Sequence, residues 1–265
     1  MTAFKNRRHG LIWFPSMRGI AYLSVLRECL VLPSVIIVLE NELSFVKGLA
    51  EEDKINGYSK KYFNINDSIE SFAIEFNIPI ITTSAHSIND DSVVKELNKT
   101  ALKYWLFTGG GVLKTKLFEN ERQFLHIHPG KLPEYRGSTC FYYSLLNNLS
   151  LCSSAFFLTP SLDKGTTLVS CDFSLNLTID DNQQLFMDYI LDPWIRAQTL
   201  KKVLMLSIPE PFLDPLSVEE STTINSNKVI DRTYYVMHPL LRALTINKVN
   251  QAFNVNQPTG VFLIE

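Results

Sequence analysis

The sequence has few cysteines and no long hydrophobic run. Its four cysteines lack Cys-x-x-Cys spacing and are too sparse among 265 residues for a disulfide framework. The longest apolar run, over residues 30–39, is interrupted by Pro33 and Ser34 and is too short to cross a bilayer. The apolar stretch behind the basic N-terminal residues is shorter than a signal-peptide core. We therefore expect a cytoplasmic protein with reduced thiols and no membrane partner.

The sequence also lacks an excess of charge of either sign. It has 25 Lys and Arg against 27 Asp and Glu, for a net charge of −2, and no basic block is longer than a pair. Nucleic-acid binders usually carry a broad basic surface, so a nucleic-acid partner is disfavoured. The Gly-x-Gly-x-x-Gly pattern is missing as well: residues 15–19, after the first predicted strand, read PSMRG. Binding of NAD is accordingly disfavoured.

The sequence contains enough apolar residues for one sizeable core. With 46% hydrophobic and 20% charged residues, it suits a single α/β core with a small appendage. The composition changes late in the chain: three prolines from Pro209 onward and a Ser/Thr/Asn-rich run to Asn227 predict a loop. We predict a catalytic domain over residues 1–208 and a small C-terminal subdomain over residues 209–265.

Apolar runs and helical spacings alternate along the chain. Two helix starts are specific: Asp67 with Glu70 forms a capping box, and Asp192 is expected as an N-cap before Pro193. This alternation predicts an α/β fold with a Rossmann-like, mostly parallel sheet flanked by helices and a small C-terminal α+β element. The predicted strands are 11–14, 35–39, 78–82, 104–107, 153–158, 166–173 and 234–237. The predicted helices are 18–30, 67–77, 89–99, 112–118, 139–147, 182–191, 193–206 and 240–245.

Residues 124–137, FLHIHPGKLPEYRG, carry the most specific pattern in the chain. Alternation places His126 and His128 on one face of a strand end, just before a Gly/Pro-rich loop. Side chains at the carboxyl ends of parallel strands face the crevice in which open α/β sheets bind ligands. A second segment, residues 162–165 (LDKG), follows after about one helix and one strand and contributes Asp163.

These segments resemble a known signature. HIHPGKLPEYRG followed by SLDKG resembles the N/H-x-H-P-x-x-L-P-x-Y-R-G plus D-x-G pattern of the 10-formyltetrahydrofolate-dependent formyltransferases, most clearly over residues 102–172. The catalytic trio of that family is Asn, His and Asp. His128 matches the family's His and Asp163 its Asp, whereas His126 stands where the family usually has Asn. The resemblance implies the formyltransferase fold, 10-formyltetrahydrofolate as co-substrate and no metal.

The folate site is predicted around three consecutive glycines that follow strand 104–107. Glycine lets a backbone approach a neighbour closely, and the resemblance implies that the formyl-bearing arm of the folate lies here. The alternative is a tight turn from strand to helix. The predicted folate-binding residues are Phe107, Gly109, Gly110, Gly111, Val112, Leu113, Thr159 and Leu162.

Formyl transfer to an amine needs a donor for the developing oxyanion and a route for the amine's proton. We predict that a protonated His128 donates to the oxyanion and that Asp163 raises its pKa. A neutral His126 can replace the family's Asn amide in only one tautomer, and its alternative role is a core-facing spacer. Two histidines and Asp163 could also form a zinc site, which is disfavoured because no further cluster supports it.

Three residues of the central loop are predicted to contact the substrate: Lys131, Tyr135 and Arg136. Arg and Lys near a cleft suit phosphate or carboxylate groups. For Arg136 the alternative, in which it braces the loop by donating to backbone carbonyls, is slightly favoured.

The leading functional hypothesis is transfer of the formyl group of 10-formyltetrahydrofolate to the primary amine of a small substrate. The family resemblance favours a nucleotide-linked dideoxyamino sugar, and hence a role in glycan biosynthesis. Two alternatives stay open: a formyltetrahydrofolate hydrolase, and a non-catalytic module that binds folate or a sugar nucleotide. Apolar stripes in residues 182–206 indicate core or dimer packing, so a homodimer is possible.

Overall fold

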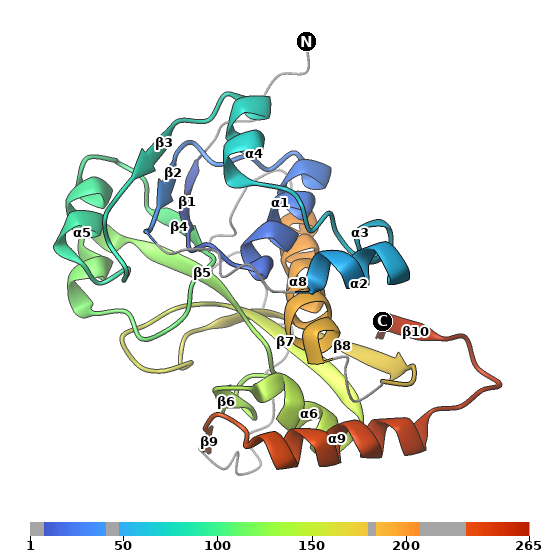
Figure 1. Cartoon of the computed structure of the whole chain (residues 1–265). Coiled ribbons are helices and arrows are strands. Elements are labelled where there is room, and N and C mark those ends of the chain that lie inside the picture. The colour runs from blue at the N-terminus through green and yellow to red at the C-terminus, as the bar shows by residue number, and fades with distance from the viewer. Residues whose placement is uncertain (1–7, 41–47, 180–183, 207–231, 265) are drawn as a thin grey trace.

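The computed structural model describes residues 8–40, 48–179, 184–206 and 232–264. An eight-stranded sheet in the order β10-β8-β7-β5-β4-β1-β2-β3 runs through it (Figure 1). The strands of this sheet are β1 (His9–Trp13), β2 (Ile36–Val38), β3 (Ile80–Thr82), β4 (Tyr104–Phe107), β5 (Gln123–His128), β7 (Ser150–Phe157), β8 (Thr167–Asn176) and β10 (Gly260–Ile264).

The sheet has a parallel part and an antiparallel part. The pairings between β3 and β2, β2 and β1, β1 and β4, and β4 and β5 are all parallel. The later strands β7, β8 and β10 are added antiparallel. The predicted α/β fold with a mostly parallel sheet is therefore confirmed, and the carboxyl ends of β1, β4 and β5 meet at one edge.

Helices cover both faces of the sheet, because successive strand residues face opposite sides. Leu11 and Trp13 join a core with α1 and α8, whereas Ile12 joins a second core with α5. Helices α1 and α8 pack against each other (Figure 1). The helices are α1 (Met17–Cys29), α2 (Leu49–Asn56), α3 (Tyr58–Lys61), α4 (Ile69–Phe76), α5 (Asp91–Asn98), the 3-10 turn η1 (Thr115–Glu121), α6 (Cys140–Asn148), α7 (Gln184–Phe186), the π-helical turn η2 (Met187–Leu191), α8 (Asp192–Leu206) and α9 (Pro239–Ala252).

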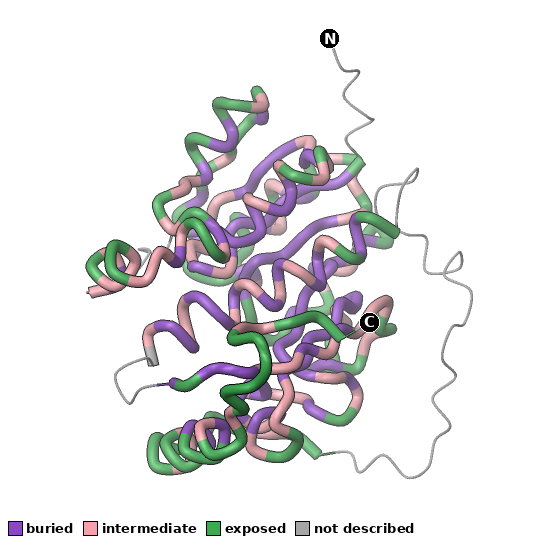
Figure 2. Tube along the Cα trace, turned by 90° about the vertical axis from the view of Figure 1, so that its right-hand side faces the viewer, coloured by how far each residue is buried: buried purple, intermediate pink, exposed green. Residues whose placement is uncertain are grey.

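Burial separates the central strands from the C-terminal elements. Figure 2 shows the strands in the middle of the sheet as mostly buried, whereas α9 and the strand that ends the chain are largely exposed. Within the described ranges, none of the helices is long and apolar enough to cross a membrane.

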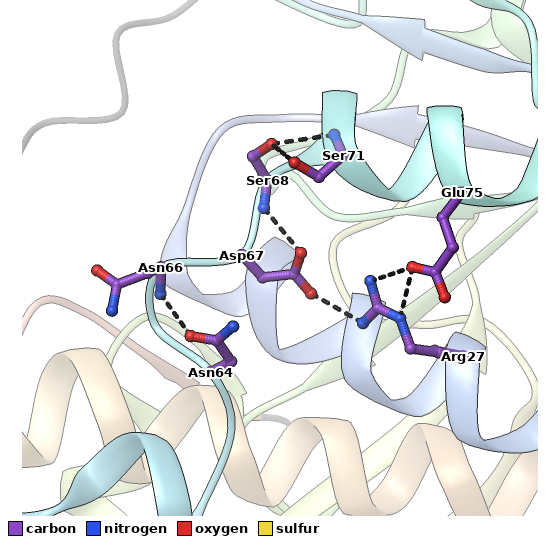
Figure 3. Close-up of polar contacts among 7 residues, drawn as sticks. All are labelled: Arg27, Asn64, Asn66, Asp67, Ser68, Ser71 and Glu75. Carbon is purple, nitrogen blue, oxygen red and sulfur yellow. Dashed lines mark hydrogen bonds and ion pairs between the residues drawn. The ribbon is translucent and has the colours of Figure 1, made fainter.

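The predicted capping box at the start of α4 is wrong. Ser68 is the N-cap, and its Oγ accepts a hydrogen bond of 3.1 Å from the Ser71 backbone N–H (Figure 3). The Asp67 carboxylate instead lies 2.9 Å from Arg27 on α1. Ser68 therefore caps the helix, while Asp67 forms an ion pair with a neighbouring helix.

The predicted N-cap role of Asp192 is also wrong. Its φ of −58° and ψ of −49° are helical, and the π turn η2 continues through it into α8. Its carboxylate lies 2.9 Å from Arg196, one turn further along the helix. The segment after Gln184 is thus continuous helical structure, and residues 182–183 of the predicted first helix lie outside the described residues.

The later predictions differ mostly in length. Instead of a helix over 112–118, the chain forms the 3-10 turn η1, and the predicted strand 234–237 is the short β9 (Thr233–Tyr234). Strand β9 pairs with β6 (Arg136–Gly137), in the central loop. Strand β10 was not predicted, and it pairs with β8 in the main sheet. The predicted loop to Asn227 lies outside the described residues, and the division of the chain after residue 208 stays a prediction.

Candidate active site

A cavity of about 470 Å³ opens at the carboxyl ends of β1, β4 and β5. This is the edge where open α/β sheets bind their ligands. Seven of its lining residues are among the predicted site residues: Phe107, Gly110, Gly111, His126, His128, Leu162 and Asp163. The others are Arg18, Pro129, Gly137, Ser138, Thr139, Leu158, Arg196, Thr233, Tyr234 and Tyr235.

Strand β5 positions both histidines on the same face, as the sequence predicts. The rings of His126 and His128 pack edge-on against Phe156, at centroid distances of 5.9 and 6.3 Å. Both are buried, with exposures of 7% and 2%. The intervening Ile127 points into the core on the other face. The cavity thus receives two imidazoles that the strand holds in fixed positions.

The hydrogen bonds of His128 define which of its nitrogens carries the proton. Its Nε2 lies 2.7 Å from the Tyr135 backbone carbonyl oxygen. Because that oxygen can only accept, Nε2 must carry a hydrogen. The other ring nitrogen, Nδ1, lies 3.7 Å from Oδ2 of Asp163. In a neutral His128, therefore, Nδ1 has a free lone pair on the side of the carboxylate.

Asp163 is held in place by the central loop. Its Oδ2 accepts a 2.8 Å hydrogen bond from the Gly137 backbone N–H. Its carbonyl oxygen accepts one from Nε of Arg136, at 3.2 Å. The backbone of Asp163 is in the left-handed region, with a φ of 48°. A non-glycine residue in this region is uncommon, and here it directs the carboxylate toward His128.

Burial determines the charge of both histidines. It lowers the pKa of His128 to about 4, an effect that the neighbouring Asp163 carboxylate opposes only in part. The pKa of His126 also lies well below its usual value, first through burial and then through the positive charges of Arg18 and Arg196. Both rings are accordingly neutral at pH 7, in place of the protonated His128 that we expected.

The glycine loop only partly matches the predicted folate site. Gly110 and Gly111 line the cavity, and a Cβ at either position would meet nothing within 4 Å. Gly109 packs against the ring of Phe107, where a Cβ would lie 2.4 Å from a ring carbon. Leu113 is in the core, with 1% exposure. Val112 and Thr159, like Gly109 and Leu113, are not among the residues that line the cavity.

The three predicted substrate contacts bond to other groups of the protein. Nζ of Lys131 is 3.3 Å from the Asp172 carboxylate. The hydroxyl of Tyr135 accepts hydrogen bonds from two Asn side chains of α6. Arg136 donates to the Asp163 carbonyl, as in the alternative that has it bracing the loop. None of the three lines the cavity, so contact with a ligand there would require other side chains.

The cavity wall also contains two arginines and two tyrosines that we did not predict: Arg18, Arg196, Tyr234 and Tyr235. Arg18 is on α1, directly after the first parallel strand, and that position was the one available signal. Arg196 comes from α8, far away in the sequence. Tyr234 stacks on Tyr135 at 5.4 Å, and the neighbouring Tyr235 is 78% exposed.

The described residues contain no group of three or more His, Cys, Asp or Glu side chains placed to hold a metal ion. The ionisable side chains that line the cavity are its two imidazoles, the Asp163 carboxylate, two guanidinium groups and two tyrosines.

Comparison with known proteins gives one sequence match and several structural ones. No protein-family model matches the chain. It is 29% identical over 131 residues to the methionyl-tRNA formyltransferase of Finegoldia magna, a match that spans 48% of this chain and only 40% of that enzyme. The structure resembles phosphoribosylglycinamide formyltransferase from Streptococcus pneumoniae, with 12% identity, a TM-score of 0.50 and coverage of 76% of this chain and 98% of the other. Glycinamide ribonucleotide transformylase 1 from Symbiobacterium toebii gives 11% identity, the same TM-score and coverage of 76% and 86%.

At this level of identity the structural matches establish the fold. The chain has the formyltransferase fold, and its resemblance to the 10-formyltetrahydrofolate-dependent formyltransferases, predicted from HIHPGKLPEYRG, extends from the motif to the three-dimensional structure.

Proposed function

We propose that the protein is an N-formyltransferase that moves the formyl group of 10-formyltetrahydrofolate to the primary amine of a small substrate. The observation that carries this proposal is the pair formed by Nδ1 of His128 and Oδ2 of Asp163, 3.7 Å apart at the cavity. Both atoms are hydrogen-bond acceptors while His128 is neutral.

Two acceptors at this separation suit a primary amine. One nitrogen can lie about 2.8–2.9 Å from both atoms and donate one N–H to each. The amine would then be held by its hydrogens, with its lone pair free to attack a formyl carbon. When the nitrogen bonds to the formyl carbon it must lose a proton, and Nδ1 of His128 is placed to accept it; the bond from that carbon to N10 of the folate then breaks, and the proton passes from the imidazolium to N10. Asp163 would stabilise the imidazolium that results.

The wall of the cavity suits the formyl donor. Gly110 and Gly111 leave open space where side chains would stand, and Phe107 and Leu162 supply apolar surface. 10-Formyltetrahydrofolate would contribute the activated formyl group there. His126 stands in place of the family's Asn and is neutral, and its ring hydrogen-bonds the Phe107 backbone, so it donates to the formyl oxygen only in the tautomer whose hydrogen lies on the other ring nitrogen.

The finer part of the proposal is the acceptor, a nucleotide-linked dideoxyamino sugar. Tyr235 supports it, since this exposed aromatic ring lies at the cavity and offers a flat face to a sugar or base. The segment is fixed there: the Tyr235 carbonyl accepts from Oγ1 of Thr139, and Ser138 N–H donates to the Tyr234 carbonyl. Glycan biosynthesis in the cytoplasm would follow from such a substrate.

The test is turnover of 10-formyltetrahydrofolate by the purified chain with a panel of amino-sugar nucleotides and other small amines. Release of tetrahydrofolate that requires the amine, with a formylated product in the mass spectrum, is the expected result. Equal release of formate without any amine would identify a hydrolase instead. Folate binding without turnover across the panel would leave a binding module.

A further inference from the structure

Two guanidinium groups meet in the cavity beside His126. Arg18 comes from the first turn of α1 and Arg196 from α8, and these helices pack together. Both arginines line the cavity. Each arginine lowers the pKa of His126, and Arg196 lowers that of Arg18, so the three side chains lie within electrostatic reach of one another.

The charge of Arg196 is already compensated. Its Nη2 and Nε lie 2.9 and 3.0 Å from the two carboxylate oxygens of Asp192. Its Nη1 donates to the Ile127 carbonyl at 3.2 Å. A bidentate carboxylate pair of this kind fixes both the charge and the orientation of a guanidinium.

Arg18 has no such carboxylate. Its Nε donates to the Thr108 carbonyl at 2.7 Å, which anchors the plane of the guanidinium. Within the described residues, neither Nη group of Arg18 is hydrogen-bonded. The first turn of α1 also contains no acidic residue, although the positive end of a helix dipole favours one. The favourable charge of Asp192 near Arg18 is already paired with Arg196, whose own charge opposes that of Arg18.

His126 adds a second unused polar group at the same place. It lines the cavity with 7% exposure, and its Nδ1 is buried and has no hydrogen-bond partner in the part of the chain that the structure describes. Buried polar atoms are usually paired, so an unpaired one beside the unpaired Nη groups of Arg18 points to a ligand.

We propose that Arg18, oriented beside the Arg196–Asp192 pair, binds an anionic group of the acceptor substrate, either a phosphate or a carboxylate. This inference rests on the proposed function, because it assigns the part of the acceptor that carries no amine. The free Nη groups form a fork that matches two oxygens of one anion. The acceptor is accordingly an acidic amine, whose anionic group docks on Arg18 while its amine reaches His128 and Asp163.

The experiment measures anion binding directly. Wild type, Arg18→Gln, Arg18→Lys and Arg27→Gln are each titrated with pyrophosphate and, separately, with malonate by calorimetry. Arg27 is the matched control because it lies on the same helix but pairs with Asp67 and Glu75 outside the cavity (Figure 3). Binding of 5-formyltetrahydrofolate to each variant is measured in parallel.

Wild type and Arg27→Gln should bind at least one anion, and Arg18→Gln should bind it about tenfold or more weakly, as expected for loss of a charged hydrogen-bond pair. Arg18→Lys should fall between them, because lysine keeps the charge but not the fork. The stronger of the two anions identifies the class of acidic group.

Unchanged anion binding in Arg18→Gln, or no anion binding by the wild type, would overturn this inference. If folate still binds in that case, the proposed function stands without it. A wild type that does not bind the folate analogue would count against the proposed function itself. Equal weakening of folate binding in Arg18→Gln would also refute a subsite for the acceptor.

Discussion

The protonation state of His128 can be tested by lowering the pH. Burial to 2% exposure lowers its pKa to about 4 from 6.5, although the Asp163 carboxylate and the Nε2 hydrogen bond to the Tyr135 carbonyl both oppose this shift. At pH 5 a group with a pKa of about 4 is about 90% neutral, whereas one with the ordinary value of about 6.5 is only about 3% neutral. If neutral His128 accepts the amine's proton, the two cases differ about thirtyfold in the fraction of active enzyme.

The assay has two parts. The ring resonances of the histidines are followed by NMR from pH 8 to 4 in the ligand-free protein, and His128 is assigned by its loss in His128→Gln. The pH dependence of kcat/KM is then compared with the titration of the free acceptor amine, whose own protonation also lowers the rate at acid pH. The enzyme's own acid limb should lie near pH 4.

A His128 resonance that titrates at pH 6.5 or above would refute this reasoning. It would mean that the attraction of Asp163, 3.7 Å away, outweighs the burial of the ring. The protonated His128 would then return as a donor to the oxyanion, and the amine's proton would need another acceptor.

Three further predictions use the same contacts. Asp163→Asn should lower turnover by about 100-fold, because an amide cannot stabilise the imidazolium, while 5-formyltetrahydrofolate still binds. Asp172→Asn, outside the cavity, is the control. Turnover of Asp163→Asn within about threefold of wild type would show that Asp163 is misassigned. His126→Asn should keep most of the activity and His126→Ala should lose about 100-fold, since only the amide can still donate. An alanine variant with activity near that of wild type would make His126 a spacer. Burial lowers the pKa of His9 to about 3. Between pH 6.5 and about 3, His9 therefore binds a proton in the unfolded chain but not in the folded one, and stability falls as the pH falls through this window. The free energy of unfolding, measured in urea, should drop by about 2 kcal/mol less between pH 7 and pH 5 in His9→Gln than in wild type, and an equal drop would contradict the assigned pKa.

The fold could be predicted from the sequence where the pattern is local. Strand β4 has the predicted bounds because Tyr104 to Phe107 is a short apolar run ended by glycines. The predictions of helix starts failed where an ion pair engaged the residue that was expected to cap the helix. Asp67 pairs with Arg27 of another helix, and Asp192 pairs with Arg196 along a continuous helix. A single sequence does not show such pairing.

Those residues of the site that belong to one sequence motif could be predicted. His126, His128 and Asp163 lie together because the motif encodes the end of β5 and a turn that packs beside it. Arg18 and Arg196 belong to no such motif. They reach the cavity because α1 and α8 pack on one face of the sheet, which is a property of the fold.

Position 126 connects the motif with these two arginines. A histidine there could add a third positive charge to a cavity that already holds Arg18 and Arg196, but burial and the arginines themselves keep its pKa low. The neutral ring therefore resembles the uncharged Asn of the family in charge, while its buried Nδ1 has no partner in the described structure. An anion on Arg18 would reduce the repulsion that keeps His126 neutral and so raise its pKa. Occupation of the proposed anion site should accordingly shift the His126 resonance toward higher pKa in the same NMR titration, and Arg18→Gln should remove the effect of added pyrophosphate. If the anion does not shift the His126 titration, Arg18 and His126 are not coupled, and the anion site does not explain why His stands in place of the family's Asn.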